Sequence, residues 1–281
     1  MIQCKELNKE FATKEEMFKE LIANKELLIK EKLSQTYKSF EKGLGLVANQ
    51  ESIVKALETE KAFKMDSDYY YFVVNTANIL DSHGDVHVKG NWDKTVKEQQ
   101  GKVYLVFDHN LKRSEIIAMK EDIEMFTAEI PFSLIGKNYE GKSYSLIYKV
   151  AKNKIVNKEA KEWLENGYSL EASVRMQYVK IDLAIDSKES GNEKEKETFD
   201  KYIEIIANKS DYESIDYFWV VKEAKNVYES SLVMFGSNSA TGVAQENKSE
   251  AEEITSEQPE PTKVTQKEES TTGAKRKRSI I

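Results

Sequence analysis

Three strand-like stretches of the sequence each carry a side chain suited to nucleophilic acyl transfer. The run VYLVFDHN includes His109, GYSLEASVRMQY carries Ser173, and NVYESSLVMFGSN carries Glu229. A hydroxyl nucleophile, an imidazole base and a carboxylate that orients the imidazole make up a catalytic triad, which is recognised by geometry and not by order along the chain. The sequence therefore nominates His109, Ser173 and Glu229 as catalytic residues.

Each of these residues also has an ordinary structural interpretation. A histidine that closes an apolar strand, as His109 does, is more often structural than catalytic. Ser173 lies outside any GxSxG nucleophile elbow, and it is distinguished only by its position after a predicted helix and turn. Glu229 also suits an outward-facing position on a strand. The assignments therefore depend on the motifs that surround them.

Two other places in the sequence carry reactive side chains. His83 and His87, with Asp81 and Asp85 nearby, resemble a metal-ligand set, but the glycines and valines around them argue against the helix of an HExxH site. The single cysteine, Cys4, cannot form an internal disulfide, and we expect an ordinary surface thiol there. We therefore favour an ordinary turn over a metal site at residues 81–87.

The composition indicates one substantial domain with appendages. The chain has 281 residues, of which 32% are charged and 40% hydrophobic, and its net charge is −7. No apolar run approaches the roughly 18 to 20 residues that span a bilayer, and the charged N-terminus lacks a signal-peptide region. We expect a cytoplasmic protein with no membrane partner. The acidic balance also predicts no specific nucleic-acid partner, and the basic cluster at 275–278 is interpreted as solvated charge.

The chain divides into three parts by composition. Residues 1–62 are predicted to form a helical N-terminal extension, because apolar residues recur at helical spacing after a capping pattern at Thr13. Residues 63–240 form the predicted core domain, with a charged insertion at about 183–212 that we expect to be a mobile surface segment. Residues 241–281 are rich in Glu, Ser, Thr and Lys and are predicted to be a disordered tail.

The core domain is predicted to be α+β, with an antiparallel, β-rich and barrel-like architecture and a few helices. Runs of aromatic and β-branched residues predict strands. Helical spacing predicts a helix across residues 142–168, ending at Gly167 as a C-cap glycine. Predicted strands lie at residues 69–74, 102–109, 122–132, 171–182, 214–224 and 227–235.

Four motifs in order resemble those of the tailed-phage prohead proteases, which are capsid-maturation serine proteases related in fold to the herpesvirus assemblins. They are a D-x-x-G-D turn leading to a glycine and an aromatic residue, a strand ending on histidine, a Gly-x-x-x-x-x-Ser-Val element, and a closing E-x-S-L-V element with an asparagine-containing turn. The resemblance covers about residues 69–243. The matching residues are Asp81, Gly84, Asp85, Gly90, Trp92, His109, Gly167, Ser173, Val174, Glu229, Ser231, Leu232, Val233 and Asn238.

The sequence departs from this family in three places. Arg175 replaces the glycine that commonly follows Ser-Val, and GSN at 236–238 replaces a Pro-Ala-Asn turn. The charged segment at 186–200 lengthens the gap between the serine and glutamate elements. Arg175 bears most directly on the geometry around the nucleophile.

The resemblance implies a serine endopeptidase with Ser173 as nucleophile, His109 as base and Glu229 as third member, and this mechanism requires neither a metal nor an organic cofactor. Its implied substrates are scaffold segments of the major capsid protein and the protease itself, inside the assembling prohead in an infected bacterium, and homo-oligomers are a further expectation. Two alternatives stay open. One is an inactive internal scaffold or capsid-assembly protein, and the other is a β-rich binding module in which His109 and Ser173 never meet.

Overall fold

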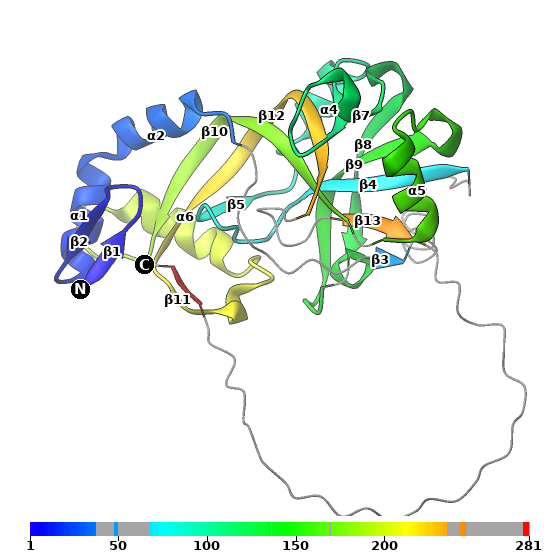
Figure 1. Ribbon diagram of the computed structural model, residues 1–281. Coiled ribbons are helices and arrows are strands. Elements are labelled where there is room, and N and C mark those ends of the chain that lie inside the picture. The colour runs from blue at the N-terminus through cyan, green and yellow to red at the C-terminus, as the bar shows by residue number, and fades with distance from the viewer. Residues whose placement is uncertain are drawn as a thin grey trace, which may run out of the picture.

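Two β-sheets packed face to face, with helices at their ends and on their outer surfaces, make up the described part of the chain (Figure 1). The computed structural model describes residues 1–37, 48–49, 68–135, 137–168, 170–234, 242–245 and 278–280. The helices are α1 (Lys14–Ala23), α2 (Lys25–Ser34), α4 (Asp93–Gln99), α5 (Lys158–Asn166) and α6 (Glu193–Ile203).

The first sheet is built on a long antiparallel pair, β10 and β12, in the order β10-β12-β6-β7. β5 and β6 both run parallel to β12, on its side away from β10. β10 therefore forms an edge of this sheet. The strands are β5 (Asp85–His87), β6 (Tyr104–Phe107), β7 (Ile116–Ala118), β10 (Glu171–Ile185) and β12 (Tyr217–Val233).

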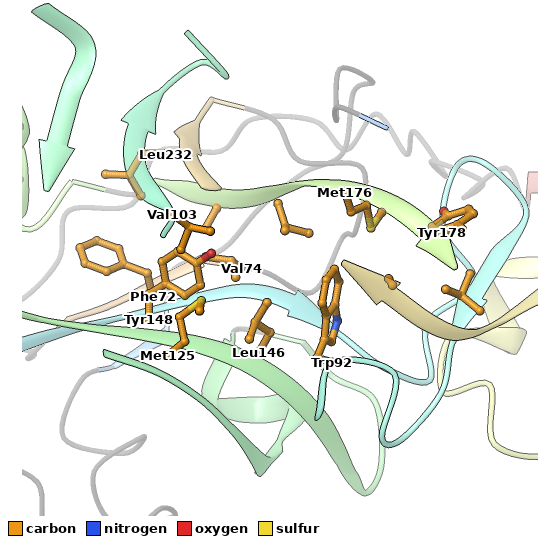
Figure 2. Packing of buried hydrophobic residues seen from close by; sticks show 14 of the residues in the cluster. Phe72, Val74, Trp92, Val103, Met125, Leu146, Tyr148, Met176, Tyr178 and Leu232 are labelled. Carbon is orange, nitrogen blue, oxygen red and sulfur yellow. The ribbon is translucent and has the colours of Figure 1, made fainter. Parts of the chain in front are cut away.

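The second sheet has the order β3-β13-β4-β9-β8, and its long strands are antiparallel. Figure 2 shows side chains of this sheet, such as Phe72 and Tyr148, pointing toward Met176 and Leu232 of the first sheet. Burial of this apolar surface between the sheets is the main source of their packing energy. The strands are β3 (Ala48–Asn49), β4 (Tyr69–Thr76), β8 (Ile123–Pro131), β9 (Lys142–Ala151) and β13 (Gly242–Gln245).

The residues predicted as one helix across 142–168 form a strand and a shorter helix. Residues 142–151 are β9, which is buried on both faces, and α5 follows at Lys158–Asn166. A short apolar run fits either a strand or a buried helix, so its period did not decide between them. The predicted C-terminal end of the helix is correct, because Gly167 caps α5 in the left-handed conformation, with φ of 77°.

The charged insertion contains an ordered helix, so the prediction of a mobile segment is wrong. α6 lies against β10, and Phe199 is buried with its ring centroid 5.4 Å from that of Phe218 (Figure 1). Apart from the buried Glu195, the charged residues of α6 largely face solvent, as expected of an amphipathic helix. β11 (Tyr212–Ile215) follows and pairs with β14 (Arg278–Ile280).

The N-terminal residues form a hairpin followed by two helices. β1 (Ile2–Cys4) pairs with β2 (Lys9–Phe11), and the Thr13 side chain caps α1 as predicted. The hairpin replaces the helix expected there, and Cys4 is fully buried, which corrects its assignment as a surface thiol. Of the predicted extension at 1–62, residues 38–47 and 50–62 lie outside the described residues.

Three lysines of the N-terminal segment pair with acidic residues of the core domain. The Nζ–carboxylate distances are 2.7 Å for Lys14 and Asp216, 2.5 Å for Lys25 and Glu195, and 2.7 Å for Lys32 and Asp85. The last pair is buried and therefore depends on both partners. These contacts hold α1 and α2 near one end of the β10–β12 pair, away from α5 (Figure 1).

The α+β class is correct, but the barrel-like architecture is not. No sheet closes into a barrel within the part of the chain that the structure describes. Apart from β13 and β14, the predicted tail at 241–281 lies outside the described residues, as does the turn at 236–238. Among the described helices, none is long and apolar enough to cross a membrane.

Candidate active site

His109 lies in a sharp turn at the end of β6. The strand runs parallel to β12, and the Asp108 N–H donates to the Leu232 carbonyl at 3.0 Å. Asp108 and His109 then both adopt left-handed backbone conformations, with φ of 47° and 54°. Such conformations cost free energy in non-glycine residues and persist where surrounding contacts fix them. Here the turn brings the His109 ring against β10 and β12.

The pairing of β10 with β12 places the other two candidates on one face of the sheet. Ser173 lies opposite Ser231, and Glu229 precedes Ser231 by two residues. Because side chains alternate along strands, all three side chains lie on the same face. Their neighbours Ala172 and Leu232 belong to the core between the sheets, so the candidate residues lie on the other face. A register shift in β12 at Tyr228, with φ of 70°, directly precedes Glu229.

The structure brings His109, Ser173 and Glu229 into direct contact. The His109 Nε2 atom is 3.0 Å from Ser173 Oγ, and Nδ1 is 3.0 Å from Glu229 Oε1 and 3.2 Å from Oε2. A carboxylate accepts a hydrogen bond from Nδ1–H, which fixes the tautomer in which Nε2 is unprotonated and can accept a hydrogen bond from the serine hydroxyl. This separation contradicts the alternative in which His109 and Ser173 never meet.

All three residues are buried, which strengthens electrostatic interactions among them. Exposed fractions are 6% for His109, 5% for Ser173 and 0% for Glu229. Glu229 is therefore not an outward-facing strand residue. A carboxylate at this depth is stabilised by the hydrogen bonds it accepts. Burial raises the pKa of Tyr148 above its usual value, and the Glu229 carboxylate adds to that rise, so the phenol remains neutral.

Ser231 is a further member of the cluster whose role the sequence did not reveal. Its hydroxyl donates to Glu229 Oε2 at 2.7 Å and accepts from the His109 backbone N–H at 2.8 Å. It thus holds the carboxylate and the histidine backbone in one arrangement. Its sequence signals are its place in the E-x-S-L-V element and its spacing of two from Glu229, which places both side chains on one face of a strand.

Arg175 does not displace the triad contacts. It lies two residues after Ser173, and its guanidinium carbon is 6.0 Å from the centroid of the exposed Tyr228 ring. Among the described residues it makes no ion pair. The departure from glycine at this position is therefore compatible with a hydroxyl–imidazole contact.

The aspartates and histidines of residues 81–87 serve other contacts. The Asp85 carboxylate accepts from Lys32 Nζ and from the Tyr178 hydroxyl, each at 2.7 Å. Asp81 Oδ1 accepts the backbone N–H groups of Asp85 and His83. Among the described residues, no three His, Cys, Asp or Glu side chains are arranged to hold a metal ion. This turn therefore joins α2 to the core domain.

His87 is buried as a neutral ring. Burial lowers its pKa to about 4, and its Nδ1 atom accepts from Asn91 Nδ2 at 2.8 Å. The ring lies parallel to Trp92, with centroids 6.0 Å apart. These contacts indicate a role in packing.

Comparison with protein-family models, with curated protein sequences and with solved structures gave no match to this chain. The chemistry of the site must therefore be inferred from its own geometry. A buried serine–histidine–glutamate triad, with hydrogen-bonding distances from the imidazole to both the hydroxyl and the carboxylate, is suited to nucleophilic attack on a carbonyl carbon.

Proposed function

We propose that this protein is a serine endopeptidase of the prohead-protease type, which cleaves scaffold segments of the major capsid protein and its own chain. The observation that carries the proposal is the 3.0 Å separation of His109 Nε2 from Ser173 Oγ, with Glu229 on the opposite ring nitrogen. The geometry supports acyl transfer. The resemblance of the ordered motifs supports the peptide substrate and the setting in a prohead.

The proposed reaction uses the three residues in the usual order of a serine hydrolase. His109 Nε2 accepts the Ser173 hydroxyl proton as Oγ attacks the peptide carbonyl carbon. The C–N bond then breaks, and the leaving amine takes that proton from His109. Water, deprotonated by the same ring, hydrolyses the ester and restores the serine. Glu229 stabilises the imidazolium that forms in each step.

The first experiment is covalent labelling with a fluorophosphonate, which reacts with activated serines. Wild type should be labelled at Ser173, and Ser173→Ala and His109→Ala should not. Ser114→Ala is the matched control, because Ser114 is exposed and its hydroxyl donates to the carboxylate of its neighbour Glu115, not to a residue of the triad. Folded wild type that resists labelling would favour the inactive scaffold protein.

The second experiment tests peptide cleavage itself. Intact masses of freshly expressed wild type and Ser173→Ala should differ, with only wild type shortened at one or more bonds. Identical trimming of both proteins would assign that cleavage to host proteases and remove its support for self-processing.

A further inference from the structure

A small pocket with a volume of about 150 Å³ lies beside the turn that carries His109. Asp108, the residue before the base, forms part of its wall. Val233 forms another part, and it pairs with Glu171, two residues before Ser173 on β10. Two residues of strand span about 7 Å, so a long side chain of a peptide held at Ser173 can reach this pocket.

One side of the pocket is apolar. Phe107 and Trp163 meet edge to face there, with ring centroids 5.4 Å apart, and the half-buried Trp163 ring lines the space beside Leu170, Leu232 and Met234. A pocket that buries a whole small molecule usually measures roughly 300 to 1,000 Å³, so this one suits a single side chain. Walls of this kind accommodate the methylene stem of a long side chain.

Three carboxylates also line the pocket, those of Asp108, Glu115 and Glu159. In the part of the chain that the structure describes, none of them forms an ion pair. The Glu115 carboxylate accepts a hydrogen bond from the Ser114 hydroxyl at 2.7 Å. Glu159 lies in the first turn of α5, where a negative charge suits the helix dipole, but the helix does not account for the other two carboxylates. Three negative charges around one small pocket favour a cation in it.

The two walls that carry Glu115 and Glu159 are joined by Asn157. Its Nδ2 donates to the Ser114 carbonyl at 3.0 Å, and its Oδ1 accepts the Ala160 N–H at 3.1 Å as the N-cap of α5. The pocket is therefore held in shape by the protein itself. A preformed pocket loses less conformational entropy when a side chain enters it.

We propose that this pocket binds a lysine or arginine side chain of the substrate, so that the enzyme cuts peptides close to a basic residue. This inference rests on the proposed function and adds a substrate class to it. The methylene stem packs against the Trp163 ring, and the cationic head lies among Glu115, Glu159 and Asp108. Because Asp108 is next to the base, the basic residue lies within about two residues of the scissile bond.

The test measures cleavage of peptides in which lysine is replaced by norleucine, which keeps the methylene stem and removes the charge. Digestion of a random peptide library by wild type, with Ser173→Ala as the inactive reference, first gives the bonds that are cut. Matched lysine and norleucine peptides then compete for the enzyme. Wild type should cut the lysine peptide about 5-fold to 10-fold faster, as expected of one favourable ion pair.

The variants assign that preference to the pocket. The double variant Glu115→Gln/Glu159→Gln should cut both peptides at similar rates. Glu159→Lys should raise the rate for a glutamate peptide relative to the lysine peptide, which a loss of folding would not do. Glu165→Gln is the matched control, because Glu165 is exposed on the same helix and lies outside the pocket, and it should keep the wild-type preference.

Fluorophosphonate labelling of each variant counts its active sites and separates this inference from the proposed function. Normal labelling of wild type with equal cleavage of the lysine and norleucine peptides overturns the substrate class and leaves the proposed function standing. A lysine preference that survives in the double variant overturns the assignment to this pocket. Absence of labelling in folded wild type overturns both.

Discussion

Replacement of Ser231 by alanine isolates the contribution of the fourth residue of the site, whose hydroxyl contacts both Glu229 and the His109 backbone. The variant removes the 2.7 Å hydrogen bond to Glu229 Oε2 and the acceptor of the His109 backbone N–H. A hydrogen bond to a charged group contributes about 1.5 to 3 kcal/mol. If that free energy is used to hold Glu229 against His109 in the transition state, labelling of Ser173 slows by about 10-fold to 150-fold.

The assay is the second-order rate constant for fluorophosphonate labelling, measured beside the unfolding free energy. Ser230→Ala is the matched control, because Ser230 is the neighbour of Ser231 on β12 but lies on the core face, where its hydroxyl is hydrogen-bonded to Tyr148 and Asn226. It should lower stability without slowing labelling. Ser231→Thr keeps a hydroxyl and should recover much of the rate. Equal labelling rates for Ser231→Ala and Ser230→Ala would refute the positioning role.

Three further predictions concern stability, each measured by urea unfolding. For His87→Phe, the free energy of unfolding should depend less on pH than in wild type. The His87 pKa of about 4 in the folded protein lies below the ordinary value near 6.5, so wild type loses about 3 kcal/mol of stability as pH falls from 6.5 to 4. The variant lacks the imidazole and should not show this loss. Phe199→Ala should cost about 3 to 5 kcal/mol, because α6 anchors on this ring; a surface-like loss under 1 kcal/mol would contradict that anchor. Lys32→Met should cost about 3 to 5 kcal/mol, because it leaves the fully buried Asp85 without its cation, and Lys14→Met, at an exposed lysine, should cost far less.

Local sequence patterns predicted the strands of the active site but not which strands lie side by side in the sheet. Aromatic and β-branched runs correctly indicated β4, β6, β8 and β10, and the candidate residues were chosen from their places on such runs. The two strands predicted at 214–224 and 227–235 are instead one continuous strand, β12. The order β10-β12-β6 arises from contacts between segments more than 30 residues apart, from Ile185–Tyr217 between β10 and β12 to Tyr104–Glu229 between β6 and β12, which no local period encodes. The contact between His109 and Ser173 follows from that order.

The remaining differences also have physical causes. The β9 segment is buried on both faces, so its apolar residues carry no clean alternation. α6 is highly charged, and its buried residues are Phe199 and the charged Glu195, so its composition resembles that of a loop. Ser231 required the register to be known, since only the pairing shows that its hydroxyl faces the site. Cys4 is covered by long-range contacts of the hairpin, including Tyr217.

The left-handed backbone conformations of Asp108 and His109 imply a trade-off between stability and activity. Each such conformation in a non-glycine residue costs on the order of 1 to 3 kcal/mol, so the Asp108–His109 pair is a locally unfavourable part of the fold. Selection for thermal stability alone would favour glycine at 108, where the backbone conformation carries little penalty. That change would also loosen the chain that fixes the base. Variants selected only for heat resistance would therefore lose the rigid backbone that fixes the position of the His109 imidazole.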